Sequence, residues 1–302
     1  MTARIAVDLL GGDNAPAVVV DGALRACQAD PALHLLLVGP TEAAGEFLAA
    51  LDPAEHRRVS ALPVTGEIES GVRTAMLAVA EGAADAVISA GNTGATVTSA
   101  ALSLGRWPGV RRPPLTAVLP TVAGRLILLD VGSSVDPDAP TLATHARLGA
   151  AYASVVHEVA APRIGLLTIG TERGKGDRLR RELPRVLSRL ALPAGARYVG
   201  LVEGHDVVLG AAADVVVTDG FTGNVLLKGL ETAYAQIGPP GPPRPVPPRA
   251  AILLGVEGTV VVCHGAAGGS DVAAGIALAA DLHRRAAVAA IEEMINEVSY
   301  DE

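Results

Sequence analysis

Short runs of apolar residues alternate with helix-like stretches along the chain, and this alternation restricts the folds that the chain can adopt. AVISAG (86–91), DVVVTDG (214–220) and TVVVCHG (259–265) are examples of the apolar runs. Because such runs are nearly continuous rather than alternating with polar residues, strands made from them are buried on both faces. The pattern predicts an α/β fold with a mostly parallel sheet that helices cover on both faces. We expect a single α/β domain over residues 1–302; a division into two lobes around a cleft stays open.

Some segments depart from the regular alternation. LTAVLP (115–120) and RLILLDVG (125–132) are separated by TVAG and predict an antiparallel hairpin. Helices are expected over about 139–159 and about 271–297. The segment GPPGPPRPVPPR (238–249) is dominated by proline, which lacks a backbone N–H, so we expect it to be a stiff, extended surface connection.

Charge and composition exclude several classes of function. The net charge of -8 argues against nucleic acid as a partner, because a nucleic-acid-binding face is basic. Aromatic residues make up only 2% of the chain, which leaves few rings for stacking on bases. Two cysteines, Cys27 and Cys263, cannot form a disulfide framework and fit a reducing compartment. Since the sequence shows neither a signal peptide nor a membrane-spanning run, we expect a cytoplasmic protein.

Polar, glycine-bearing loops follow the predicted strands. In sheets of this kind, ligands bind beyond the carboxyl ends of the strands, so these loops are expected to line a cleft. The loops are Asp8 with 11–16, then 89–95, 130–136, 169–177, 202–206, 218–224 and 263–271.

The loops lack the motifs of several common sites. No GxGxxG follows the first strand, and GTERGKG (170–176) has Gly176 where a phosphate-binding P-loop needs Ser or Thr for magnesium. There is no HExxH, no paired CxxC and no GxSxG, so neither a metal site nor a serine nucleophile is expected. What is present are hydrogen-bond donors, a lysine and helix N-termini, a set suited to holding an anion and polarising a carbonyl.

The stretch TDGFTGN (218–224) has two interpretations. Asp, Gly, Thr and Asn all suit turns and helix caps, and taken alone the stretch favours a turn, with the helical pattern beginning after Asn224. Alternatively, the glycines let a ligand approach the backbone and the helix start offers N–H groups to an anion. The gathering of polar loops favours the second interpretation.

The strand ends and their loops contain the strings AVDLLGGDNAP, SAGNTGA, LDVGSSVD, GLLTIGTERGKGD, LVEGHD, DVVVTDGFTGNVLLK and LLGVEGTVVVCHG. In this order along the chain, these strings resemble the phosphate acyltransferase family (acyl-acyl-carrier-protein:phosphate acyltransferase) of bacterial phospholipid synthesis. The resemblance implies a homodimeric α/β fold related to isocitrate and isopropylmalate dehydrogenases and to phosphotransacetylases. It also implies a reaction in which inorganic phosphate attacks the thioester of a long-chain acyl carrier protein, with no metal and no organic cofactor.

The resemblance suggests roles for particular residues. Lys175 would neutralise phosphate, helped by backbone N–H groups of residues 222–224, while Asn92 and Asn224 would donate to phosphate or to the thioester oxygen. His264 would pass a proton to the departing sulfur. Each role competes with a structural one: a solvated loop lysine, helix caps and a structural histidine. The remaining candidates, which would order the loops or bind substrate, are Asp8, Asp13, Asn14, Thr93, Gly94, Asp219, Gly220, Thr222 and Gly223. Of these, Asp219 would orient Lys175 or Thr222, and turn formation is favoured for Asp13 and Asn14.

The chain departs from the family pattern in three places. Leu9-Leu10 replaces the usual Ala-Met, and CHGAAGGSD (263–271) is longer than the corresponding family loop. After Leu230 the chain runs into the proline-rich segment, where family members carry a long amphipathic helical hairpin associated with membrane contact. Peripheral membrane association therefore stays open. Three alternatives also stay open: a phosphotransacetylase-like enzyme that uses acyl-coenzyme A, a non-catalytic scaffold, and, least favoured, a decarboxylating dehydrogenase.

Overall fold

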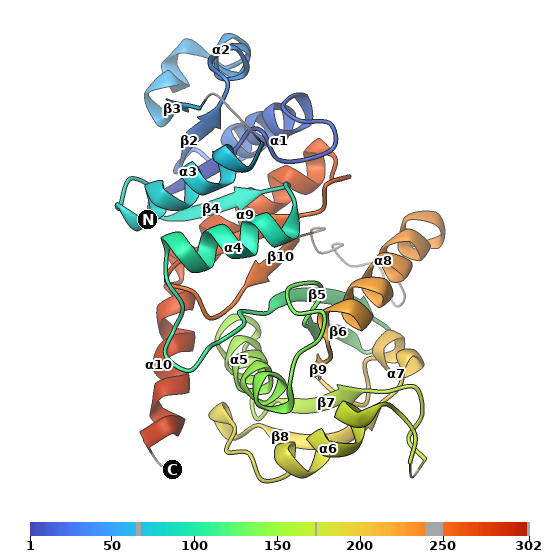
Figure 1. The fold of residues 1–302 in the computed structure, drawn as a ribbon. Coiled ribbons are helices and arrows are strands. Elements are labelled where there is room, and N and C mark those ends of the chain that lie inside the picture. Colours follow the sequence, from blue (N-terminus) through green and yellow to red (C-terminus); the bar gives the residue numbers. More distant parts are fainter. Residues whose placement is uncertain (65–67, 173, 239–249, 301–302) are drawn as a thin grey trace. The chain divides into compact units, whose positions relative to one another are not determined.

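The computed structural model of the chain describes residues 1–64, 68–172, 174–238 and 250–300 (Figure 1). The described residues within 1–107 and 248–288 form one compact unit, and those within 108–247 and 289–302 form the other. Residues 239–249, and with them nearly all of the predicted proline-rich connection, lie outside the described residues. No helix among the described residues is long and apolar enough to cross a membrane.

The first unit contains neighbouring strands in the order β3-β2-β1-β4-β11-β10. The strands are β1 (Ala3–Asp8), β2 (Leu33–Gly39), β3 (Val59–Pro63), β4 (Ala86–Ser89), β10 (Ala250–Leu253) and β11 (Thr259–Cys263). The pairings are parallel from β3 to β11, whereas β10 and β11 are antiparallel. The carboxyl ends of β1, β4 and β11 therefore lie side by side at one edge.

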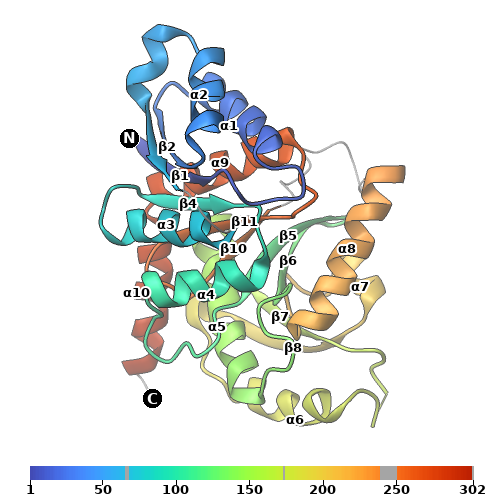
Figure 2. The same ribbon diagram turned by 45° about the horizontal axis from the view of Figure 1, so that its top comes forward.

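Helices cover both faces of these strands. One face carries α1 and α9, which pack against each other, and the other carries α3 and α4 (Figures 1 and 2). The central strands β4 and β11 are buried along their whole length, as their continuous apolar sequences predict. The helices of this unit are α1 (Ala17–Ala29), α2 (Thr41–Ala50), the 3-10 helix η1 (Pro53–Arg58), α3 (Ile68–Ala80), α4 (Thr93–Ser103) and α9 (Gly269–Arg284).

The second unit contains strands in the order β5-β6-β9-β7-β8. They are β5 (Leu115–Thr121), β6 (Gly124–Leu129), β7 (Arg163–Leu167), β8 (Arg197–Val202) and β9 (Val215–Val217). β5 and β6 form the predicted antiparallel hairpin, and the other pairings are parallel. The prediction of an α/β fold with a mostly parallel, doubly covered sheet is confirmed in both units.

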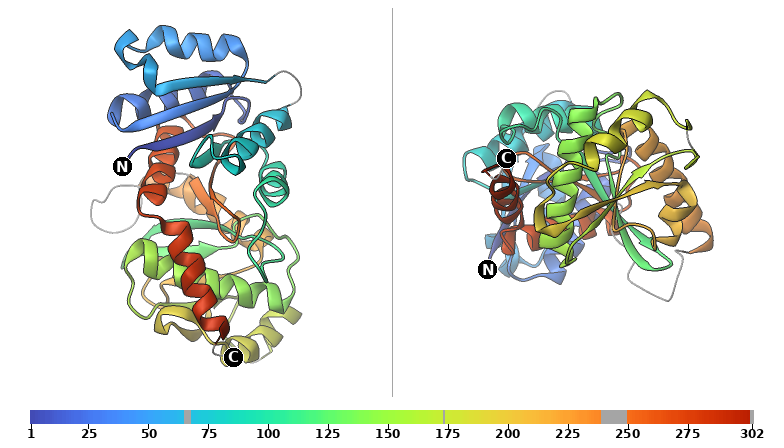
Figure 3. Two further views of the ribbon diagram at one scale, coloured as in Figure 1. Left: turned by 90° about the vertical axis from the view of Figure 1, so that its left-hand side faces the viewer. Right: turned by 90° about the horizontal axis from the view of Figure 1, so that it is seen from below.

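In the second unit, α5 and α6 pack on one face, and α7 and α8 contact strands from the other (Figure 3, right). The helices are α5 (Ala139–His157), α6 (Arg178–Leu187), the 3-10 helix η2 (Pro193–Gly195), α7 (Gly204–Leu209) and α8 (Gly220–Ile237). α5 occupies the range predicted for it, and α6 begins directly after Asp177, whose side chain accepts from the N–H of Arg180.

Two helix boundaries differ from the sequence prediction. The helix expected over 271–297 is two helices, α9 and α10 (Ala287–Tyr300), because the backbone turns at Ala286, where φ is 49°. The helix expected to start after Asn224 starts at Gly220 instead. The reason is Asp219, whose carboxylate accepts the N–H of Thr222 at 2.8 Å and so caps α8 five residues earlier than its apolar pattern indicates.

Candidate functional site

The polar loops that follow β1, β4 and β11 come together in the first unit. Val7 pairs with Ile88, and Ser89 pairs with Val262, so Asp8 and Ser89 end neighbouring strands. The buried Asp8 carboxylate accepts the Ser89 hydroxyl at 2.7 Å and the N–H of Leu10 at 3.1 Å. The Ser89 hydroxyl in turn accepts the N–H of Gly91 at 3.0 Å. This network ties the first loop to the SAGNTGA loop.

Close packing explains a glycine of the first loop. A Cβ at Gly11 would lie 2.6 Å from the backbone nitrogen of Gly91 and 2.7 Å from an oxygen of Asp8. Any larger residue would force the two loops apart. Gly11 is therefore required by the contact between the loops, whether or not a ligand approaches it.

The other candidates of the first unit lie around this network. Asn92 caps α4, since its side-chain oxygen accepts the N–H of Ala95 at 3.0 Å, and Thr93 and Gly94 form the first turn of that helix. The N–H of Asp13 donates to the carbonyl of Gly265 at 2.8 Å, which joins the first loop to the loop after β11. Asp13 and Asn14 are exposed and His264 is half-buried. The structure thus brings the candidates from residues 8, 13, 14, 92–94 and 264 to one strand edge.

The second unit repeats this arrangement around Asp130, which sequence reasoning did not single out. Asp130 directly follows β6, whereas Asp8 is the last residue of β1, and Asp130 is fully buried. One of its oxygens accepts the N–H groups of Gly132, Ser133 and Leu115, and the other accepts the N–H of Ser134 at 2.7 Å. The signal in the sequence is an aspartate directly after an apolar strand, with glycine within the next few residues.

The glycines of TDGFTGN (218–224) pack directly on this loop. A Cβ at Gly223 would overlap the carbonyl oxygen of Asp130, and one at Gly220 would lie 2.8 Å from the carbonyl oxygen of Ser134. The Asn224 side chain donates to the carbonyl of Val131 at 2.9 Å. The first turn of α8 is thereby held against residues 130–134.

Backbone N–H groups at the start of α8 already have partners, among them two of those proposed for phosphate binding, Thr222 and Gly223. The N–H of Thr222 donates to the Asp219 side chain, and the N–H of Gly223 donates to the Asp219 carbonyl at 3.0 Å. The N–H of Gly220 donates to the carbonyl of Ser134 at 2.7 Å. These three groups are not available to an anion in this conformation, so a ligand at this helix start would have to be held chiefly by side chains.

Arg180 connects the strand-end loops of the second unit, and sequence reasoning missed it. Its guanidinium donates to the carbonyl of Leu167 at 3.1 Å, to the Thr218 hydroxyl at 3.0 Å and to the Asp219 carboxylate at 2.5 Å. A further bond reaches the Asp177 carboxylate at 2.9 Å. The Arg180 side chain is only 8% exposed. Residues 178–189 contain several arginines, and nothing in their spacing identifies the buried one.

The Asp219 carboxylate accepts hydrogen bonds from both Arg180 and Thr222. Burial alone would raise its pKa, but the N–H of Thr222 and the guanidinium of Arg180 outweigh burial and lower the pKa. The Thr222 hydroxyl also donates to Asp219 at 2.9 Å. Asp219 therefore orients Thr222, one of the two partners predicted for it. The other, Lys175, is exposed in the loop between β7 and α6.

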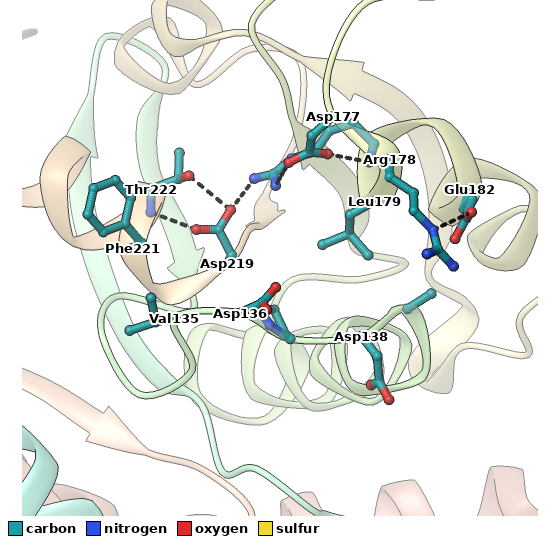
Figure 4. Close-up of a pocket in the computed structure, with 13 residues that line it drawn as sticks. Val135, Asp136, Asp138, Asp177, Arg178, Leu179, Glu182, Asp219, Phe221 and Thr222 are labelled. Atoms are coloured by element: carbon teal, nitrogen blue, oxygen red, sulfur yellow. Dashed lines mark hydrogen bonds and ion pairs between the residues drawn. The ribbon is translucent and has the colours of Figure 1, made fainter.

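Two pockets adjoin Arg180, Asp177, Phe221 and Thr222. The first, of about 710 Å³, is shown in Figure 4, where the Asp219–Thr222 pair lies between Phe221 and the Arg178–Glu182 ion pair. Its charged lining is mainly acidic: Asp136, Asp138, Asp177, Glu182 and Asp219 against Arg178 and Arg180. The second, of about 640 Å³, is bounded by Ile169, Val225 and Leu226 as well. Among the described residues, no three His, Cys, Asp or Glu side chains form a cluster that could hold a metal ion.

Asp8 and Asp130 should make folding depend on pH. Burial raises the pKa of each carboxyl to about 6, in spite of the N–H groups that each accepts. Since the folded chain binds these protons more tightly than the unfolded chain, each contribution to stability is complete below pH 4 and is lost as the pH rises through 6. The loss amounts to about 3 kcal/mol for each carboxyl.

We expect Asp130→Asn to remove one of these contributions, because asparagine does not titrate. As the pH rises from 4 to 7, the free energy of unfolding of the original chain should fall by about 3 kcal/mol more than that of Asp130→Asn. Urea denaturation of both proteins at each pH measures this difference. Asp138→Asn is the control, since Asp138 is exposed and its pKa is lowered, to about 2, by bonds from Thr141 and Arg111. A constant difference between Asp130→Asn and the original chain across this range would contradict the prediction.

Comparison with known proteins gives a consistent result. The family described as Fatty acid synthesis protein matches residues 3–238. The phosphate acyltransferase of Thermobifida fusca (strain YX) is 38% identical over 315 residues, covering 92% of this chain and 87% of the relative. The solved structure of EutD phosphotransacetylase from Staphylococcus aureus aligns with a TM-score of 0.60 at 15% identity, covering 96% of this chain and 94% of that one. Isocitrate dehydrogenase from Methylococcus capsulatus aligns with a TM-score of 0.50 at 14% identity, covering 98% and 91%. The two structural likenesses concern the fold alone, and they confirm the predicted isocitrate-dehydrogenase-like fold.

Proposed function

Because the chain belongs to the phosphate acyltransferase family, and is therefore an acyltransferase with phosphate as acceptor, we propose that its donor is a long-chain acyl group on acyl carrier protein. The product would be an acyl phosphate, which feeds acylation of glycerol 3-phosphate in cytoplasmic phospholipid synthesis. A homodimer belongs to the same proposal. In the reaction, a phosphate oxygen bonds to the carbonyl carbon, the carbon–sulfur bond breaks, and the carrier's thiolate leaves and takes up a proton.

To catalyse this reaction, the protein needs mainly to position the reactants and to stabilise negative charge. Phosphate at neutral pH is already a nucleophile and a thiolate is a good leaving group, so neither a serine nor a cysteine nucleophile is needed. The observation that carries the proposal is the meeting of two loops at the carboxyl edge of the second unit. The loop after β7 contains Lys175 and leads into Arg180, and Arg180 bonds directly to Thr218 and Asp219 of TDGFTGN.

Within the proposal, Lys175 attracts phosphate, and the Asn92 and Asn224 amides donate to phosphate or to the thioester oxygen. His264 supplies the proton to the departing sulfur. Asp8, Asp13, Asn14, Thr93 and Gly94 shape loops of the first unit, and Gly220, Thr222 and Gly223 shape loops of the second.

The proposal is tested with palmitoyl-carrier protein and palmitoyl-coenzyme A in parallel, each with and without inorganic phosphate. Acyl phosphate is trapped with hydroxylamine and measured as the hydroxamate. We expect phosphate-dependent product from the carrier-bound donor. Product from coenzyme A alone would overturn the donor assignment, and no product from either donor with the folded protein would overturn the activity.

Lys175→Ala should raise the KM for phosphate by about tenfold or more, because a cation near the anion is lost. The chain contains only one other lysine, Lys228, which is exposed on α8 and provides a matched control. Lys228→Ala should leave the phosphate dependence unchanged. Equal phosphate dependence in the two variants would remove Lys175 from the site.

A further inference from the structure

Three large apolar side chains are exposed near the carboxyl edge of the second unit. Ile169, in the loop after β7, is 81% exposed, and Phe221 and Val225, on α8, are 63% and 60% exposed. Phe221 and Val225 are four residues apart on a helix, so their side chains lie on the same face. The chain has only two phenylalanines, and the other, Phe47, is fully buried. Exposed apolar groups gathered in this way mark a binding surface.

These side chains bound the pocket of about 640 Å³ together with Leu167 and Leu226. Its volume lies within the range of roughly 300–1,000 Å³ that is usual for small-molecule sites. The polar side chains of the lining belong to the loops of the proposed reaction site or adjoin them; they are Thr168, Asp177, Arg180, Glu203 and Thr222. An apolar wall therefore continues directly from the polar loops. A ligand that fits both has a reactive polar head and an apolar tail.

An acyl chain suits this wall better than a peptide does. A bound peptide needs partners for its own N–H and C=O groups, whereas the N–H groups of Gly220, Thr222 and Gly223 already donate within the protein. A hydrocarbon chain needs no such partners, and each methylene that it buries adds to binding.

We propose that the pocket bounded by Ile169, Phe221 and Val225 binds the hydrocarbon chain of the acyl donor. The inference rests on the proposed function, and it assigns the selection of long-chain donors to this wall. The thioester then lies toward Thr222 and Arg180, at the polar end of the same pocket.

The test is the dependence of kcat/KM on acyl length, measured with four-, eight- and sixteen-carbon donors at saturating phosphate. Phe221→Ala and Val225→Ser should each lower kcat/KM about tenfold for the sixteen-carbon donor and less than twofold for the four-carbon donor. Leu102→Ser is the control, because Leu102 is 81% exposed on α4 and lies in the other unit. It should leave the length dependence unchanged. Equal losses at all lengths, or no loss at any, would overturn the inference.

Binding of palmitate, measured by calorimetry, gives a readout that does not require turnover. Phe221→Ala should weaken it about tenfold relative to the original chain, and equal affinity would overturn the inference even if the original chain transfers acyl groups. The opposite result is also informative. If Phe221→Ala binds palmitate more weakly but the original chain forms no acyl phosphate, the pocket is supported and the proposed function is refuted. A second copy of the chain could cover these apolar side chains instead. Sedimentation of the original chain and of Phe221→Ala tests this alternative. A dimer that dissociates in Phe221→Ala, with unchanged length dependence, would assign the patch to an interface and overturn the inference.

Discussion

Gly223→Ala should lower the free energy of unfolding by about 3 kcal/mol, the upper part of the usual range for overpacking. A Cβ at this position would overlap the carbonyl oxygen of Asp130, which is backbone and cannot rotate away. Relief would require α8 to move from the loop that follows β6. Because that movement would also pull Asn224 from the carbonyl of Val131, we expect Gly223→Ala to reduce acyl transfer even where the chain stays folded.

Gly229→Ala provides a matched control on the same helix. Gly229 is exposed, and a Cβ there would have no atom within 4 Å. Alanine is the better helix former, so Gly229→Ala should raise the free energy of unfolding by roughly 0.5–1 kcal/mol. Urea denaturation of both variants at one pH gives the comparison. Similar changes in the two variants would show that the contact between Gly223 and Asp130 is not tight in solution.

The packing at Gly220 and Gly223 also explains why TDGFTGN was ambiguous in the sequence. Its composition fits a cap, a tight contact or a ligand site, and the structure shows that it is at least the first two. Asp219 caps α8, and both glycines meet the backbone of residues 130–134. The apolar periodicity could not predict this start of the helix, because the cap and the first turn carry no apolar pattern. Glycine content alone therefore does not distinguish a ligand site from close backbone packing.

Most strands could be predicted because their apolar runs are continuous and end in polar loops. β4, β9 and β11 are buried along their whole length, which is what such runs require. The parallel order then places Asp8, Ser89 and His264 at one edge and residues 130, 168 and 218 at another. The break between α9 and α10 could not be predicted, because Ala286 gives no sign of its positive φ. Helix-forming residues surround it on both sides.

Buried polar partners were the least predictable part of the site. Asp8 was chosen as a candidate and Asp130 was not, although both lie at the carboxyl end of a strand and both are buried. Lys175 attracted attention as a lysine between two glycines, yet Arg180 makes the contacts that join the loops. Burial depends on which face of α6 meets β7, and that is decided by long-range packing. Local spacing within 178–189 does not contain this information.

Arg180→Ala should lower the free energy of unfolding by about 3–5 kcal/mol, because it leaves the buried Asp219 carboxylate without its cation. The substitution also leaves the carbonyl of Leu167 and the hydroxyl of Thr218 without this donor. The lowered pKa of Asp219 means that the pair contributes stability above about pH 4, the ordinary range of an aspartate, and that this contribution is lost as the pH falls further. The destabilisation by Arg180→Ala should therefore shrink below pH 4.

Arg178→Ala is the matched control for this prediction. Arg178 lies on the same helix, its side chain is 84% exposed, and its partner Glu182 is a surface residue. Its loss should change the free energy of unfolding by less than about 1 kcal/mol at any pH. Arg180→Lys should recover only part of the loss, because a lysine ammonium cannot reproduce the planar set of donors that reaches Leu167, Thr218 and Asp219 together. Equal stability of Arg180→Ala and Arg178→Ala, or full stability of Arg180→Lys, would show that the Arg180 guanidinium does not join the strand-end loops. The position of TDGFTGN would then depend on its contacts with Asp130 alone.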